Sequence, residues 1–91
     1  MRYEWDEDKR LANIRKHNID FMDVPEIYAG DTITMEDTRQ DYGETRFVAI
    51  GILKGRVIVV VYTERGDTTR IISARKATQY EQINYFKKIF D

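Results

Sequence analysis

The chain contains no cysteine, and it has only one histidine and one proline among its 91 residues. Without cysteine it can form neither a disulfide framework nor a thiolate zinc site, and a single histidine does not favour a structural metal centre. We therefore expect no metal site and no cofactor, and a chemistry that is metal-free or uses carboxylate ligands alone.

Long apolar segments are also missing. No apolar run approaches the roughly 20 residues that a membrane-spanning helix requires, and the acidic start from Met1 to Asp8 is unlike a signal peptide. These absences predict a cytoplasmic protein without a membrane partner. With 42% hydrophobic and 34% charged residues, the chain is expected to fold as a single domain over residues 1–91, with room for one site.

The formal net charge of −1 conceals an uneven distribution. Residues 24–50 carry six acidic and two basic residues, a balance of −4, whereas residues 51–91 carry eight basic and four acidic residues, a balance of +4. A nearly neutral protein does not attract nucleic acid through its overall field, but a local basic face can still contact several phosphates. The distribution favours a small local site over a protein that coats DNA.

The N-terminal third reads as helical. Residues 3–5 suit a short strand, and Asp6 is a suitable N-cap for a helix that ends at Asn18 in the left-handed conformation. A second short helix is predicted over residues 24–29, with Asp23 as its N-cap.

The rest of the chain predicts a sheet followed by a helix. Strands are expected at residues 32–35, 46–53, 57–63 and 69–72, with turns at Lys54-Gly55 and Gly66-Asp67. The apolar run from Val57 to Val61 predicts a central strand covered on both faces by the first and last helices. Ser73 is the predicted N-cap of a final helix from Ala74 to about Phe90. The expected fold class is α+β, with an antiparallel sheet of about four strands.

The final helix carries Tyr80, Ile83, Phe86 and Phe90 over a wide arc. Such an arc is consistent with simple packing on the sheet or with an apolar patch that a partner chain covers. The sequence leaves both interpretations open.

The polar face of the first predicted helix is also ambiguous. At 100° per residue, Lys9, Asn13, Lys16 and His17 lie opposite Leu11 and Ile14. This face is either a solvated charged surface or a phosphate-facing stripe that ends in a titratable imidazole.

Arginines gather near the predicted strand ends and one turn, namely Arg46, Arg65, Arg70 and Arg75. A guanidinium group is a planar fork of donors that stays charged and fits a phosphate or a carboxylate through two hydrogen bonds. The arginines therefore indicate an anion site, although they do not say which anion is bound.

Short motifs follow one another in a characteristic order: Glu4-Trp5-Asp6-Glu7, Lys9, Asn13, Lys16-His17, Phe21, Tyr42-Gly43-Glu44-Thr45-Arg46, Tyr62-Thr63-Glu64-Arg65, Arg70-Ile71-Ile72-Ser73-Ala74-Arg75-Lys76-Ala77 and Glu81. From Trp5 to about Glu81 the chain resembles the BrnT family of bacterial type II toxins. Two positions depart from the usual pattern, because Asn18 stands where glycine is common and Pro25 where helix formers are common.

The resemblance implies a RelE-like fold, metal-independent endoribonuclease activity that arrests translation, and neutralisation by a BrnA-like antitoxin with a ribbon-helix-helix fold. It also implies that DNA is contacted only indirectly, through the antitoxin in the complex.

Cleavage of RNA without a metal needs a base for the 2′-hydroxyl proton, cations for the transition state and an acid for the leaving 5′ oxygen. The candidates for phosphate stabilisation are Arg46, Arg70 and Arg75, and the candidates for proton transfer are His17, Glu44 and Glu64. Further RNA contacts are expected from Lys9, Lys16 and Arg65.

Each candidate also has a purely structural interpretation. Glu44 can pair with Arg46, Glu64 can pair with Arg65 in a turn, and His17 can cap a helix dipole. A non-enzymatic module, whose arginines grip acidic residues of a partner protein, is the alternative function.

Overall fold

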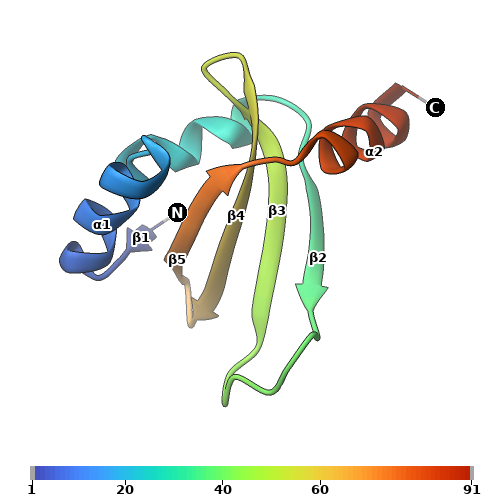
Figure 1. Ribbon diagram of the computed structural model, residues 1–91. Coiled ribbons are helices and arrows are strands. Elements are labelled where there is room, and N and C mark those ends of the chain that lie inside the picture. Colours follow the sequence, from blue (N-terminus) through green and yellow to red (C-terminus); the bar gives the residue numbers. More distant parts are fainter. Residues whose placement is uncertain (1, 91) are drawn as a thin grey trace.

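The computed structural model describes residues 2–90 and contains a five-stranded sheet in the order β1-β5-β4-β3-β2 (Figure 1). The strands are β1 (Arg2–Glu4), β2 (Ile33–Asp37), β3 (Arg46–Leu53), β4 (Arg56–Arg65) and β5 (Thr68–Lys76). The helices are α1 (Glu7–His17), the 3-10 helix η1 (Phe21–Ala29) and α2 (Gln79–Phe90). The α+β class is confirmed, but the sheet has five strands rather than about four. The fifth strand is β1, which was predicted as a short strand at residues 3–5 but not counted in the sheet. It pairs with β5 in parallel, whereas all other pairs are antiparallel.

The predicted caps of α1 are confirmed. The Asp6 side chain accepts a hydrogen bond from the Lys9 amide at 3.1 Å, and Asn18 ends the helix with a φ of 57°. Asparagine tolerates this left-handed conformation better than most residues, which explains how it replaces glycine here.

The prediction that Asn13 lies on an exposed polar face of α1, either solvated or facing a phosphate, is wrong. Asn13 is only 7% exposed, whereas Leu11 is 42% exposed. The Asn13 amide nitrogen donates to the Ile19 carbonyl at 2.9 Å, and its side-chain oxygen accepts from the Ala74 amide at 3.2 Å. Because β1 ends at Glu4, the edge of β5 near Ala74 has no neighbouring strand. The Asn13 side chain instead supplies the hydrogen-bond partner of the Ala74 amide.

The second helix starts earlier than predicted. The N-cap of η1 is Asp20, whose side chain accepts from the Met22 amide at 2.9 Å, rather than Asp23. Phe21, Val24 and Ile27 are fully buried at a spacing of three residues, which is the period of a 3-10 helix. This period puts all three side chains onto the sheet.

One face of the sheet is covered by η1, and we call it the covered face. Its core consists of apolar side chains from η1, the segment before it and alternate positions of β3, β4 and β5, namely Ile19, Phe21, Val24, Ile27, Ala49, Leu53, Ile58, Val60, Tyr62, Ile71 and Ala74. Trp5 and Phe21 meet edge to face at 6.4 Å between ring centroids.

The final helix begins later than predicted. Ser73 lies within β5 opposite Val61, and the strand continues to Lys76 because it keeps pairing with β4. The helix is capped instead by Thr78 and Glu81, whose side chains each accept a hydrogen bond from the other's backbone amide, at 3.2 and 2.8 Å.

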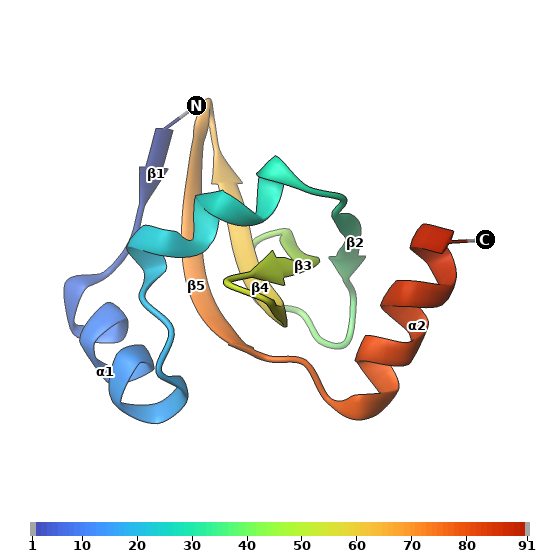
Figure 2. The same ribbon diagram turned by 90° about the horizontal axis from the view of Figure 1, so that it is seen from above.

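The opposite face of the sheet, which we call the open face, is only partly covered. Tyr85 and Ile89 of α2 pack against Val57 and Val59 of β4, and the Tyr85 hydroxyl donates to the Asp31 carbonyl at 2.6 Å. Strand β4 is central, as predicted, but the prediction that α1 covers one of its faces is wrong, and α2 covers only part of the other. Helix η1 covers one face, and α1 and α2 lie on opposite sides of β5 (Figure 2).

Candidate functional site

A row of polar side chains crosses the open face at one end of the sheet. Arg46 of β3 is paired with Asp37 of β2, and Arg70 of β5 is paired with Thr63 of β4 and Glu4 of β1. The next pair of β3 and β4, Phe47 with Tyr62, stacks on the covered face, so residues 46 and 63 point to the open face. Neighbouring strands are about 4.8 Å apart. Arg46 and Arg70 therefore stand on either side of Thr63.

Each arginine of this row has a carboxylate beside it. Arg46 donates to Glu44 at 3.3 Å and lies 4.1 Å over the Tyr42 ring, while Arg65 reaches the same carboxylate at 3.7 Å. Arg70 pairs with Glu4. The predicted residues Glu44, Arg46 and Arg65 thus form one cluster, with Arg70 in the same row of the sheet.

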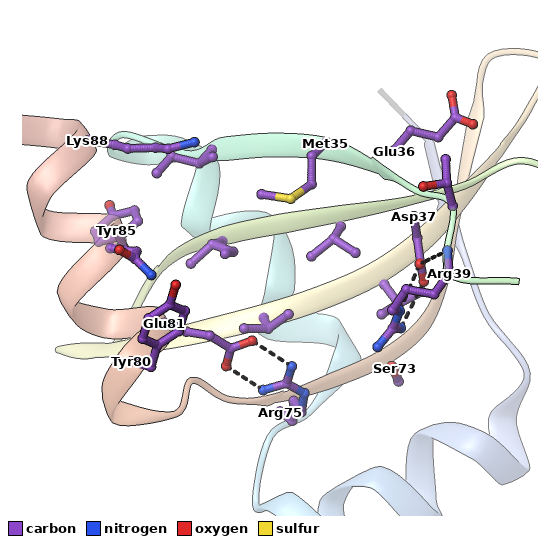
Figure 3. Close-up of a pocket in the computed structure, with 17 residues that line it drawn as sticks. Met35, Glu36, Asp37, Arg39, Ser73, Arg75, Tyr80, Glu81, Tyr85 and Lys88 are labelled. Carbon is purple, nitrogen blue, oxygen red and sulfur yellow. Dashed lines mark hydrogen bonds and ion pairs between the residues drawn. The ribbon is translucent and has the colours of Figure 1, made fainter.

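Beyond this row the open face and α2 enclose a groove of about 670 Å³ (Figure 3). Its floor is apolar and comes from β2, β3 and β4, whereas its walls carry the charged and aromatic side chains. The lining residues used below are Asp37, Arg39, Ser73, Arg75, Tyr80, Glu81 and Lys88. The groove combines an apolar floor with convergent polar groups, which is typical of a ligand-binding site.

Two arginine–carboxylate pairs face each other along the groove (Figure 3). Arg75 donates through both terminal nitrogens to Glu81 at 2.8 and 2.9 Å, and Arg39 donates to both oxygens of Asp37 at 2.9 Å. Arg39 and Arg75 both line the groove. Two guanidinium groups therefore converge on one groove, each neutralised by an internal carboxylate.

These pairs shift the pKa values of the two carboxyl groups. Hydrogen bonds from Arg75 are the largest cause that lowers the pKa of Glu81 to about 2. Hydrogen bonds from Arg39, helped by the Tyr42 hydroxyl at 3.0 Å, hold the pKa of Asp37 well below its usual range. Both carboxylates are ionised at neutral pH and are strong hydrogen-bond acceptors.

The other predicted site residues lie elsewhere. Glu64 is on the covered face, where it accepts a hydrogen bond from the Thr69 hydroxyl at 3.2 Å. Lys9, Lys16 and His17 belong to α1, on the side of β5 away from α2 (Figure 2). Of the predicted site residues within the described range 2–90, only Arg75 lines the groove itself.

Sequence reasoning gave no role to Arg39 or Lys88, placed Tyr80 only in the apolar arc of the final helix, and named Glu81 only as a position of the family pattern. The Thr78–Glu81 capping signal was present in the sequence and would have placed Tyr80, Glu81 and Lys88 at the correct positions of α2. Arg39 follows β2 in an acidic segment. Its place in the same groove as Arg75 depends on the order of the strands, which local sequence patterns do not reveal.

Within residues 2–90, no helix is long and apolar enough to span a membrane. The same residues contain no group of three histidine, cysteine, aspartate or glutamate side chains that could hold a metal ion.

Comparison with known proteins gives one family. The model of the family described as "Ribonuclease toxin, BrnT, of type II toxin-antitoxin system" matches residues 5–81. No curated protein matches the chain. The matched segment begins at Trp5, directly after β1, contains α1, η1 and strands β2 to β5, and ends at Glu81 in the first turn of α2. Because it covers most of the 91 residues, the chain belongs to the BrnT family of ribonuclease toxins of type II toxin–antitoxin systems.

Proposed function

We propose that this toxin is a metal-independent endoribonuclease that binds RNA on its open face and arrests translation by cleaving it. The observation that carries the proposal is the common face of the arginines. Arg46 and Arg70 flank Thr63 in one row, and Arg75 points from the same face into the groove together with Arg39. An RNA strand that crosses the row and enters the groove would meet guanidinium groups along its backbone.

The ion pairs of these arginines do not prevent RNA binding. The side chains of Arg46, Glu44, Arg70 and Glu4 are each between 26% and 39% exposed. Ion pairs at such partly exposed sites typically contribute about 0–1 kcal/mol to stability. A phosphodiester can therefore exchange with the carboxylates at small cost, and it gains hydrogen bonds from charged donors.

The chemistry that we propose uses side chains of the cluster, Arg70 and a proton donor such as water. The Glu44 carboxylate takes the proton of a 2′-hydroxyl, the 2′ oxygen then bonds to phosphorus, and the bond from phosphorus to the 5′ oxygen breaks. The leaving oxygen receives a proton from water or an acid, which leaves a 2′,3′-cyclic phosphate and a 5′-hydroxyl. Arg46 and Arg70 offset the charge that grows on the phosphoryl oxygens.

His17, Glu64, Lys9 and Lys16 have weaker structural support. They lie on α1 or on the covered face, so they reach the same RNA only if it wraps around the edge of the sheet. We propose them as outer contacts and not as members of the reacting centre.

The remaining parts of the proposal follow from the family. We propose a single RelE-like domain over residues 1–91 that works in the cytoplasm. A BrnA-like antitoxin with a ribbon-helix-helix fold neutralises it, and DNA is contacted only through that antitoxin.

Incubation of the purified protein with RNA in excess chelator tests the proposal. We expect fragments with 2′,3′-cyclic phosphate ends from the parent, and a loss of about 100-fold or more in cleavage rate for Arg46→Ala and Arg70→Ala. Arg15→Ala, which removes an exposed arginine of α1, is the matched control and should cleave like the parent. Parental rates in folded Arg46→Ala and Arg70→Ala proteins would contradict the site.

One observation supports a binding module as the alternative. The arginines of the row and of the groove already hold carboxylates, namely Glu44, Glu4, Glu81 and Asp37. Acidic side chains of a partner protein could occupy the same positions. Intact RNA after prolonged incubation of a folded protein, in chelator and with added Mg²⁺ alike, would favour this alternative.

A further inference from the structure

The outward side of α2 carries an exposed apolar patch, which we call the α2 patch. It consists of Tyr80, Ile83, Phe86 and Phe90, whose side chains are 75%, 50%, 40% and 78% exposed. The Phe86 and Phe90 rings stack at 6.1 Å between centroids. The patch is therefore a preformed surface rather than a set of scattered side chains.

The other sides of α2 are already in use. Tyr85 and Ile89 pack on the sheet, and Glu81, Asn84 and Lys88 line the groove. Tyr80 lies at the boundary between the patch and the groove, which it also lines. At 100° per residue, Ile83, Phe86 and Phe90 fall on a third side that faces away from both. Figure 2 shows α2 projecting to the side of the sheet. The rest of the described chain thus leaves this side of the helix open to a partner.

The patch has the size of an interface core. With about 200 Å² for a fully exposed aromatic side chain, the four residues expose roughly 450 Å² of mostly apolar surface. A standard protein–protein interface buries about 800 Å² per partner, of which a little over half is apolar. The patch therefore matches the apolar part that one partner contributes to a stable interface.

We propose that the α2 patch joins two copies of this chain through an antiparallel pair of α2 helices. The apolar positions, 80, 83, 86 and 90, have spacings of three, three and four residues, which read almost alike in both directions. An antiparallel pair centred between Ile83 and Phe86 places Ile83 of one copy against Phe86 of the other. It also places Tyr80 against Phe90, so the same patch serves both partners, as two-fold symmetry requires.

Charge is compatible with this pairing. Lys87 is the charged residue nearest the patch, and in the antiparallel pair it lies beside the neutral Tyr80 and Ile83 of the other copy, which share its edge of the helix. The formal net charge of −1 gives only weak repulsion between two whole copies. Arg75, Glu81 and Lys88 face the groove and stay outside the pair of helices, whereas Tyr80 belongs to the edge of both surfaces.

Sedimentation velocity over a range of about 1 to about 200 μM protein tests the dimer, since an interface of this size supports micromolar affinity. The parent should shift from monomer to dimer within this range. The double variant Ile83→Ser/Phe90→Ser should stay monomeric with an unchanged circular dichroism spectrum. The control Leu11→Ser/Met22→Ser removes exposed apolar residues outside the patch and should dimerise like the parent. A parent that stays monomeric at the highest concentration would overturn the proposal. The antitoxin would then be the remaining candidate partner for the α2 patch.

A cross-linking experiment tests the antiparallel register. Because the chain has no cysteine, Gln79→Cys and Phe90→Cys can be made as single-thiol proteins. Positions 79 and 90 are about 16 Å apart along one helix, but they meet across an antiparallel pair. In a mixture of the two variants under mild oxidation, a disulfide should join one variant to the other. We expect this disulfide to form at least ten times faster than the disulfide-linked dimer in a solution of either variant alone. Equal rates in the mixture and in the separate proteins would overturn the register.

Discussion

The two faces of the sheet are built from alternate residues of the same strands, yet they differ in kind. In β4, Ile58, Val60 and Tyr62 point to the covered face, whereas Val57, Val59 and Val61 point to the open face. The covered face is closed by η1 and its side chains are almost completely buried. The open face has a groove at its centre and arginine–carboxylate pairs around it. The comparison teaches that packing is concentrated on one face, which leaves the other available for function.

The largest expected effect on stability comes from a substitution in the core of the covered face. Phe21→Ala removes a fully buried ring that contacts Trp5, and it should lower the free energy of unfolding by about 3–5 kcal/mol. Met35→Ala on the open face, where Met35 is 44% exposed, should cost less than about 1 kcal/mol. Urea unfolding of both variants measures the difference. Similar losses in the two variants would show that the faces are energetically equivalent.

The next effect tests the open face. Arg39→Ala should reduce RNA cleavage by about 100-fold, because it removes one of the two guanidinium groups that converge on the groove. The free energy of unfolding should fall by about 1–3 kcal/mol, because the Asp37 carboxylate, whose side chain is only 2% exposed, loses its main hydrogen-bond donor. Initial rates with a labelled RNA provide the measurement, and Arg15→Ala serves again as the matched control. An unchanged rate would restrict the site to the row of Arg46 and Arg70.

A smaller effect is expected at the β5 edge. Asn13→Leu leaves the Ala74 amide and the Ile19 carbonyl without their side-chain partner, which should cost about 1–3 kcal/mol of stability. Amide hydrogen exchange at Ala74 should also become faster in the variant. Asn84→Leu, in the wall of the groove, is the control and should change stability much less. Slow exchange at Ala74 in Asn13→Leu would mean that another group protects this edge.

The smallest expected effect is on the stability of the protein at low pH. The folded-state pKa of Glu81 is about 2, below its usual value of 4.5, because Arg75 holds the carboxylate ionised. This contribution to stability is fully present above pH 4.5 and is lost as the pH falls toward 2. Glu81→Gln should therefore lose less stability than the parent between pH 5 and pH 2.5, as urea unfolding at both pH values would show. An identical loss in the two proteins would contradict the pKa shift.

Local signals predicted much of the fold. The caps Asp6 and Asn18, the turns at Lys54-Gly55 and Gly66-Asp67, and the central position of β4 are all confirmed. The failures occurred where contacts distant in sequence decide. Ser73 reads as a helix cap, but pairing with β4 keeps it in a strand, and Asn13 reads as solvated, but the end of β1 makes it a partner of β5.

The site was harder to predict than the fold. Arginines could be identified as anion-binding residues from their chemistry, and Arg46, Arg70 and Arg75 do point to one face. Which carboxylate accompanies each one depends on the strand order, as in the pairing of Arg70 with Glu4 across 66 positions. The same holds for Arg39, which lines the same groove as Arg75 because of the order of the strands in the sheet.

Nuclear magnetic resonance of the isotopically labelled protein, titrated with an RNA made uncleavable by 2′-deoxy substitution, tests the central claim most directly. The amide shifts that change should cluster on the open face, at Arg39, Arg46, Thr63, Ser73 and Arg75. Residues of α1 and η1 should change little. Changes concentrated instead at Lys9, Lys16 and His17, with the open face unaffected, would contradict the assignment of the open face as the RNA-binding face.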